Sequence, residues 1–348
     1  MSMFRVREVE LTDLDSLWNL ICQASAGMTS LQIDKETLND RLERAVFAFS
    51  RTTEKAEGAP YVFVMEDMMT SQLIGTSCIF SKTGGYQPLY AYKIETEKAY
   101  SEILEMETTV HSLHLIKEHN GPTEIGSLFL QPDYRGKGCG KLLSMSRFLY
   151  MAAHPKRFAS ETIAEMRGFQ DAHGISPFWE AIGAHFFKID FPRADSLSMV
   201  DKKFIEELMP KYPIYLELLP HDALESIGQV HEQTRPALSM LEAQGFRRNN
   251  LIDIFDGGPM ITCKTKEIAA IANSSTVTWQ LDEDAESDRQ CNEQAILARV
   301  TRPYIAIQTE IPSPNIEQGK EQVVRLSEQS ARDLRLSPED KLVALPLR

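Results

Sequence analysis

A short glycine-rich run with two basic residues is the part of this sequence best suited to bind a ligand. It covers Arg135–Gly140 and follows the apolar residues Leu128–Leu130. Glycines let main-chain N–H groups come close to a ligand, and several such groups pointing inward form an anion-binding nest. A helix beginning near Gly140 would add its free first-turn N–H groups and the positive end of its dipole. Arg135 and Lys137 add full charges, so the sequence predicts a loop that binds a pyrophosphate.

The spacing of the glycines indicates which kind of pyrophosphate ligand to expect. A dinucleotide-binding fingerprint requires G-x-G-x-x-G; Gly136 and Gly138 would begin it, but Lys141 stands where the third glycine should be. A P-loop requires G-x-x-x-x-G-K-[ST], and neither its first glycine nor its final hydroxyl residue is present. The pattern that fits is R-x-x-G-x-G, with Arg135, Gly138 and Gly140 at the fixed positions.

Composition limits the class of protein. A chain of 348 residues with 43% hydrophobic and 25% charged residues is typical of a globular protein that forms two or three units. The five cysteines are scattered and form neither a disulfide framework nor a C-x-x-C metal site; they are Cys22, Cys78, Cys139, Cys263 and Cys291. A net charge of −13 argues against nucleic acid or an anionic membrane as partner. We therefore expect a reduced, metal-free cytoplasmic protein, and the charge would suit a cationic substrate.

The segments before the glycine loop predict a first strand, two helices and then a meander of strands. Strand-like patterns cover 4–9, 61–65, 73–80 and 110–116, the last expected opposite the strand that contains Leu128. Thr12 and Asp34 are candidate N-caps of two helices, each with an apolar stripe. This order of two helices, a strand meander, the phosphate loop and its helix is that of a GNAT acyltransferase domain, which the loop itself also resembles. In those enzymes the loop binds acyl-coenzyme A, and the preceding strand, here Leu128 and Leu130, pairs its main chain with the pantetheine arm.

Later segments suggest a partial duplication. Residues 162–168 read as a strand, Ser176-Pro177 starts a helix by capping, and 185–190 read as a strand that follows the C-cap Gly183. A weaker echo, helix 237–244 followed by Gly245 and a strand at 251–255, suggests a second partial copy of a GNAT half-domain. From 274 onward the sequence predicts a small β-rich unit, with an acidic loop at 282–288, strands at 295–300, 304–308 and 340–345, and a helix at 327–334.

The predicted fold is therefore α/β (α+β), with a GNAT-type mixed sheet flanked by helices. We expect a GNAT-like acyl-CoA-binding domain at 1–200, a second partial half at 201–273, and the β-rich unit at 274–348. Between residue 28 and about residue 260 the chain resembles the bacterial arginine N-succinyltransferase family. The resemblance is carried by the loop and by short stretches at 28–31, 165–168, 176–179, 207–215, 227–231 and 252–259.

The resemblance implies transfer of a succinyl group from succinyl-CoA to the α-amine of L-arginine, without a metal. An amine that attacks a thioester must lose a proton, and the departing thiolate takes one up, so a group that titrates near neutrality is needed. Histidine is the natural candidate, and the chain has eight. In the family, the histidine of the motif at 227–231 is assigned as proton donor, which makes His231 the predicted catalytic residue.

Substrate contacts are predicted on charge alone. Glu165, Asp253 or Asp256 would pair with the guanidinium of arginine, and Arg167 with a carboxylate of the substrate or of the succinyl group. Each of these residues could equally be a structural ion-pair or turn residue. Two other functions stay open: the same chemistry on ornithine, and a non-catalytic GNAT-type sensor or partner subunit. Family members form dimers or larger assemblies, so the resemblance implies a homo-oligomer, with the C-terminal unit as a candidate contact.

Overall fold

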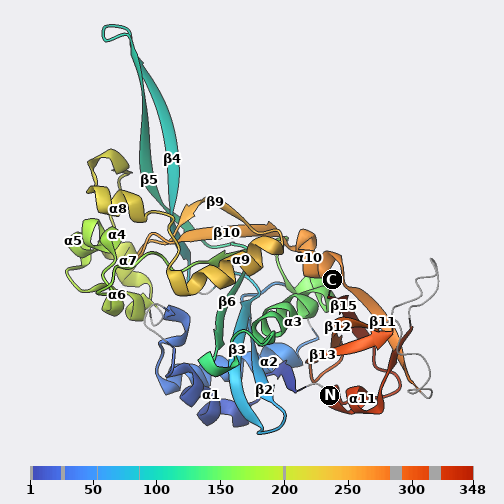
Figure 1. Cartoon of the computed structure of the whole chain (residues 1–348). Helices are drawn as coiled ribbons and strands as arrows, with labels where there is room; N and C mark the ends of the chain where they lie inside the picture. Colours follow the sequence, from blue (N-terminus) through green and yellow to red (C-terminus); the bar gives the residue numbers. More distant parts are fainter. Residues whose placement is uncertain are drawn as a thin grey trace.

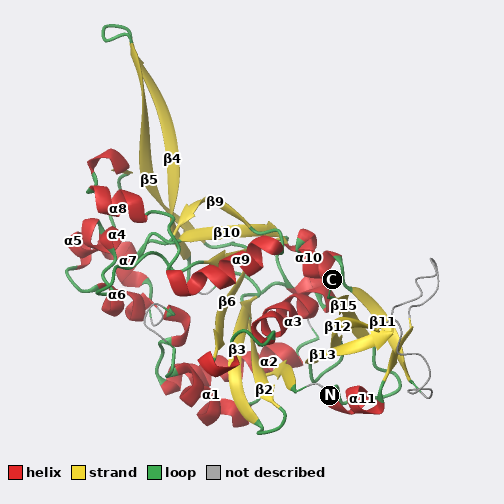
Figure 2. Ribbon diagram, viewed as in Figure 1, coloured by secondary structure: helices red, strands yellow, loops and turns green. Residues whose placement is uncertain are grey.

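A large mixed β-sheet flanked by helices forms the body of the protein (Figures 1 and 2). The computed structural model describes residues 3–24, 28–52, 54–85, 87–198, 201–282, 292–312 and 323–347. Within them the strands pair in the order β14-β11-β15-β12-β13-β1-β2-β3-β6-β7-β10-β9-β4-β5-β8. Their bounds are β1 Phe4–Glu8, β2 Pro60–Asp67, β3 Gln72–Phe80, β4 Leu89–Ser101, β5 Met106–Glu118, β6 Thr123–Leu130, β7 Glu161–Glu165, β8 Ile214–Tyr215, β9 Arg247–Ile252, β10 Pro259–Lys264, β11 Ser275–Leu281, β12 Asn292–Arg299, β13 Ile305–Pro312, β14 Val323–Leu326 and β15 Leu342–Pro346. The predicted fold class is confirmed.

Helices of very different lengths cover this sheet. They are α1 Leu14–Ile21, α2 Lys35–Ser50, α3 Cys139–Ala153, α4 Pro177–Ala181, α5 Gly183–Phe187, α6 Phe191–Ser198, α7 Lys203–Leu208, α8 His221–Ser226, α9 Arg235–Ala243, α10 Ala269–Ala272 and α11 Glu328–Asp333. The buried face of α3 packs on the central strands, with Leu143, Phe148 and Leu149 in the largest hydrophobic cluster. None of the described helices has the length and apolar character needed to cross a membrane.

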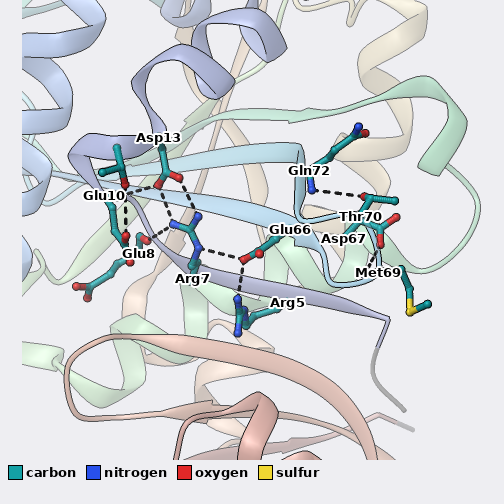
Figure 3. A network of polar contacts seen from close by, with 11 residues as sticks. Arg5, Arg7, Glu8, Glu10, Asp13, Glu66, Asp67, Met69, Thr70 and Gln72 are labelled. Carbon is teal, nitrogen blue, oxygen red and sulfur yellow. Dashed lines mark hydrogen bonds and ion pairs between the residues drawn. The ribbon is translucent and has the colours of Figure 1, made fainter.

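The N-terminal elements agree with the sequence, apart from one cap. Asp34 caps α2 by accepting a hydrogen bond from the N–H of Thr37 at 2.7 Å. The prediction that Thr12 caps the first helix is wrong, because a 3-10 turn, η1 Leu11–Asp13, comes first and the cap position of α1 falls to Asp13. The side chain of Asp13 instead binds the guanidinium of Arg7 (Figure 3).

A network of charged side chains ties β1 to its neighbours. Arg7 makes a bidentate pair with Asp13, at 2.7 and 2.8 Å, and its Nε donates to Glu66 Oε2 at 3.2 Å. Arg5 donates to the same oxygen of Glu66 at 2.8 Å (Figure 3). Paired, partly buried charges of this kind fix geometry more than they add stability. The network therefore sets the position of β1 relative to β2 and to the turn that leads into α1.

A long hairpin formed by β4 and β5 extends from the body (Figure 1). The predicted strand at 110–116 exists as part of β5, but its expected place opposite the Leu128 strand is wrong. β5 pairs with β4 along thirteen positions, from Leu89↔Glu118 to Ser101↔Met106, whereas β6 pairs with β3 and β7. β4 was not predicted, because its outer half is polar on both faces and so lacks the apolar alternation of a half-buried strand.

The predicted strand at 185–190 is wrong, because this segment contains α5. Gly183 is the first residue of α5 rather than a helix-ending cap, and a Cβ atom there would lie 2.2 Å from the ring of Trp179. Trp179 itself is fully buried and stacks on Phe187. The aromatic residues of this stretch therefore hold α4 and α5 together as a helical pair. Ser176 is the N-cap of α4, as predicted, because its side-chain oxygen accepts a hydrogen bond from the N–H of Trp179 at 3.2 Å.

Segments from the three expected units share the one sheet. α9, Gly245 and Phe246 lead into β9, which pairs with β10, and β10 pairs with β7. At the other end β13 pairs with β1, from Arg5↔Ile307 to Arg7↔Ile305. The predicted strands and helix of the C-terminal unit are confirmed as β12, β13, β15 and α11, while the acidic loop falls almost entirely on 283–290, outside the described residues. Whether 1–200, 201–273 and 274–348 are separate folding units stays a prediction, because sheet pairing alone does not divide them.

Candidate active site

The glycine loop has the predicted strand–turn–helix form. β6 ends at Leu130, a 3-10 turn, η3 Pro132–Tyr134, follows, and α3 begins at Cys139. Gly136 and Gly138 have φ angles of +76° and +79°, a left-handed conformation that side-chain-bearing residues rarely adopt. A Cβ atom at either position would meet nothing within 4 Å. The loop therefore uses its glycines to keep open space beside its main chain.

Side chains around the loop hold it against the strand that precedes it. Arg135 Nε donates to the carbonyl oxygen of Leu130 at 3.2 Å, and Tyr134 donates to Asp67 at 3.0 Å. The ammonium of Lys137 lies 5.3 Å from the centre of the Tyr134 ring. A hollow of about 190 Å³ adjoins Lys137 and Gly138. Two cationic side chains and left-handed glycines thus surround the start of α3.

The strand before the loop has a free edge. β6 pairs with β3 as far as Leu130, but with β7 only at Thr123↔Thr162 and Glu124↔Ile163. At Ser127 the backbone turns to φ +52°, and the register against β3 shifts between Thr76 and Cys78. From 125 to 130 no described strand pairs with β6 on the β7 side. Main-chain groups of Leu128 and Leu130 are therefore within a segment that can pair with an extended ligand.

Three short motifs from distant parts of the chain meet beside this edge. The N–H of His231 donates to the carbonyl oxygen of Arg167 at 2.9 Å, and Val230 forms an antiparallel bridge with Gly168. The N–H of Gly168 donates to Asp256 Oδ2 at 2.6 Å. The segments 165–168, 228–231 and 253–259, which the sequence offered separately, therefore form one structure.

Close backbone packing explains the glycines in these motifs. The N–H of Gly228 donates to the carbonyl oxygen of Gly257 at 2.8 Å. A Cβ atom at Gly258 would lie 2.1 Å from the carbonyl oxygen of Met166, and one at Gly168 would lie 2.4 Å from that of Asp256. Such distances leave no room for a side chain, so any larger residue would push the motifs apart.

His231 is half-buried, and its ring is held in one tautomer. Its Nδ1 accepts a hydrogen bond from the main-chain N–H of Gln233 at 3.2 Å, so the proton of the neutral ring belongs on Nε2. Burial and the nearby charge of Arg167 lower the pKa of His231, although Glu232 acts in the opposite direction. The ring is thus neutral around pH 7, with an Nε2–H group to offer.

The predicted acidic residues do gather, but they are not equivalent. Asp256 is buried, and its two carboxylate oxygens accept the N–H groups of Gly168 and Gly258 at 2.6 and 2.8 Å. Asp253 Oδ1 accepts the N–H groups of Phe255 and Asp256 at 2.7 and 2.9 Å. These two carboxylates hold the turn at 253–259. Burial raises the pKa of both groups, and the charge of Asp253 raises that of Asp256 further.

Glu165 differs because its side chain reaches solvent. It is the last residue of β7, beyond the point where β7 separates from β6. The surrounding protein, and then the charges of Glu124 and Asp253, raise the pKa of Glu165 well above the usual range of a glutamate. Glu124, whose pKa burial also raises, was missed by the sequence analysis.

The charge of Arg167 acts on His231, and part of its guanidinium is unused. Its Nη2 donates to Gln170 at 2.6 Å, whereas its buried Nε has no hydrogen-bond partner among the described residues. Burial lowers the pKa of Arg167, but the group stays charged at any physiological pH. A free, buried guanidinium N–H is suited to bind a carboxylate.

The His231 segment and the glycine loop are joined through α9. This helix follows His231 after a single 3-10 turn, η6 Glu232–Thr234. Its Leu238 and Leu241 belong to the same buried cluster as Leu130 and Leu142, and Met240 Cε lies 4.0 Å from the position of a Cβ at Gly140. Among the described residues, no group of His, Cys, Asp and Glu side chains is arranged to hold a metal ion. The site therefore combines a glycine loop with two basic side chains, a neutral histidine, a group of carboxylates and Arg167.

Comparisons with known proteins agree on the family. Residues 4–270 match the family model described as arginine N-succinyltransferase beta subunit. Arginine N-succinyltransferases of Shigella dysenteriae serotype 1 and of Escherichia coli are each 42% identical over 287 residues, which is 82% of this chain and 83% of theirs. The structure of the arginine/ornithine succinyltransferase subunit AI from Pseudomonas aeruginosa superposes with a TM-score of 0.87 at 30% identity, over 99% of both chains. This chain belongs to the arginine N-succinyltransferase family of acyltransferases.

Proposed function

We propose that this protein transfers the succinyl group of succinyl-CoA to the α-amine of L-arginine, which gives N2-succinyl-L-arginine and CoA, the first step of arginine catabolism by this route. The observation that carries the proposal is the meeting of the segments 165–168, 228–231 and 253–259. That meeting brings a neutral His231, the cation of Arg167 and a group of carboxylates together next to the free edge of β6. The family to which the chain belongs supports the same reaction.

In this proposal the coenzyme lies along β6 and ends on the glycine loop. Main-chain groups of Leu128 and Leu130 pair with the pantetheine arm, since β7 does not occupy that edge. Main-chain N–H groups around Gly136, Gly138 and Gly140 receive the pyrophosphate, and the N-terminus of α3 adds its partial positive charge. Arg135 and Lys137 supply full charges. No step requires a metal.

His231 acts as a hydrogen-bond donor through its Nε2–H group. As the amine attacks the thioester, negative charge develops first on the carbonyl oxygen and then on the departing sulfur, and an Nε2–H group can stabilise either. The bond from Gln233 to Nδ1 holds the ring so that this proton is the one available. The ring keeps this proton and shares it only as a hydrogen bond, while the one proton that the amine loses is the one that the departing sulfur takes up.

Charged side chains of the site select the amine that accepts the succinyl group. Glu165, with Glu124 nearby, is placed to bind the guanidinium of arginine, since it is the solvent-reaching carboxylate of the group. The partnerless Nε–H of Arg167 would bind a carboxylate, either of arginine or of the succinyl group. Asp253 and Asp256 contribute negative potential and hold the turn, because their oxygens already accept main-chain N–H groups.

The test is release of thiol from succinyl-CoA with L-arginine, with L-ornithine and without an amine. We expect arginine-dependent release that the variant His231→Ala loses while succinyl-CoA still binds. Ornithine is included because the Pseudomonas aeruginosa relative is described as an arginine/ornithine succinyltransferase subunit. Release only with ornithine would contradict the substrate, and binding without release would favour a sensor or partner subunit. We further propose a cytoplasmic homo-oligomer that binds neither nucleic acid nor membrane.

A further inference from the structure

The hairpin of β4 and β5 ends in apolar side chains that are exposed in the part of the chain that the structure describes. At its tip, Ile103 is 94% exposed and Leu104 is 67% exposed, and Glu102 and Glu105 flank them. Two more large apolar side chains of the outer hairpin, Tyr100 and Met106, are also more than half exposed. Exposed apolar groups clustered in one place mark an interaction surface more often than they occur by accident. We call residues 94–111 the arm.

Among the described residues, the contacts between the arm and the body lie at its base, where the side chain of Asn250 donates to the carbonyl oxygen of Ile94 and Glu217 accepts the N–H of His111. β9 pairs with β4 only at Tyr92 and Lys93, and β8 pairs with β5 only at Ser112 and Leu113. Beyond these positions the arm is a two-stranded ribbon that leads away from the body (Figure 1). A two-stranded hairpin is at best marginally stable in water on its own. A binding surface that covers the arm would stabilise this long hairpin and bury the apolar side chains at its tip.

A cavity with matching properties lies elsewhere on the molecule. It has a volume of about 690 Å³ and lies where the C-terminal end of α3 meets α10 and the β11–β15 pair. Buried apolar side chains line it, among them Met151, Phe158 and Val343. Two exposed lysines also line it: Lys266, and Lys264, whose ammonium pairs with Glu267 at 3.3 Å. Since α3 runs from the glycine loop to this cavity over fifteen residues, or about 22 Å, the cavity is separate from the loop.

We propose that the arm tip of one copy of this chain inserts into this cavity of a second copy. Ile103 and Leu104 would be buried against the apolar lining, and the flanking glutamates would meet Lys264 and Lys266. Figure 1 shows the arm leading away from α10, so the arm and the cavity of one copy do not meet. Two copies can exchange their arms reciprocally, which gives a closed two-fold dimer.

This contact replaces the C-terminal unit alone as the expected interface and deepens the proposed homo-oligomer. It does not depend on the proposed chemistry, since assembly is measured without substrates. Charge and apolar complementarity between two otherwise unexplained features of the same chain support a second copy as the partner. In such a dimer the arm of each subunit contacts the other subunit beside β11 and β15, which contribute residues to the cavity.

The experiment is the molar mass of the intact protein in solution, from light scattering and sedimentation. The double variant Ile103→Asp/Leu104→Asp should halve the mass of the assembly, while Thr108→Asp, at an exposed arm residue away from the tip, should leave it unchanged. Thermal unfolding of both variants shows that the body stays folded. A monomeric wild type, or a tip variant with unchanged mass, would overturn the proposal.

A charge exchange distinguishes this cavity from other partners of the arm. Lys266→Glu should weaken the dimer at least tenfold, and Glu102→Lys in the same chain should restore most of the affinity. If the tip variant dissociates but Lys266→Glu has no effect, the arm binds elsewhere and the proposed contact is wrong. Failure of thiol release with intact assembly would instead count only against the proposed reaction.

Discussion

Replacing Gly138 with alanine separates the folding role of the loop glycines from their role in binding. Gly138 has φ +79° and open space around its Cβ position, so the only folding cost is that of a left-handed alanine, about 1–2 kcal/mol. A methyl group there would enter the space expected to hold the pyrophosphate. Gly174 provides a matched control, since its φ is +78° and its Cβ position is equally open, but it lies outside the loop.

The two variants should therefore lose similar stability and differ in coenzyme binding. A lost hydrogen bond to a charged group is worth about 1.5–3 kcal/mol, which corresponds to a rise of about 10- to 100-fold in the KM for succinyl-CoA. Thiol-release kinetics at saturating arginine measure that KM, and denaturant unfolding measures the stability of each variant. If Gly138→Ala and Gly174→Ala have the same KM for succinyl-CoA, the open space beside the loop is not the pyrophosphate site.

Three further predictions concern the meeting of the motifs. His231→Ala should lower kcat by about 10²–10⁴-fold in thiol release, with the KM for succinyl-CoA within twofold of wild type; an unchanged kcat would remove His231 from the mechanism. Asp256→Ala leaves two buried N–H groups without acceptors and should lower the free energy of unfolding by about 2–6 kcal/mol in urea, against less than about 1 kcal/mol for the exposed turn residue Asp171→Ala. Because the protein raises the pKa of Glu165, and a bound cation favours the ionised form, arginine binding should release protons and tighten as pH rises. Calorimetry in buffers of different ionisation enthalpy measures this release, and proton uptake would contradict the placement of the guanidinium.

Local chemistry made the loop predictable. Glycines at 136 and 138, a basic residue on each side of Gly136 and an apolar strand before them are features that a short window contains, and the structure has the strand, the turn and the helix in that order. Asp34 and Ser176 were equally readable, because an N-cap acts within three residues. In contrast, the importance of His231 came from family resemblance, since its partners Arg167 and Gly168 are more than 60 positions away.

Elements that depend on tertiary packing were harder to predict. Aromatic residues at 186–187 fit a strand as well as a helix, and contact between Gly183 and Trp179 decides for α5. Glu124 gave no signal in the sequence, because its proximity to Glu165 arises only when β6 and β7 pair in parallel. The arm was not predicted, because a strand that leaves the core is polar on both faces. Its sequence therefore lacks the alternation of apolar and polar residues that marks a half-buried strand.

The pairing of β13 with β1 has a consequence for how the chain is made. Residues 5–7 leave the ribosome first, yet their partners at 305–307 emerge about 300 residues later. Until then one edge of β1 is an open template on which another nascent chain could add a strand. Glu8 accepts hydrogen bonds from the side chain of Arg302 and the N–H of Tyr304. These partners are also synthesised about 300 residues after Glu8. A chain that stops before residue 305 would thus carry an unprotected sheet edge, so we expect C-terminal truncation to show itself first as aggregation during synthesis.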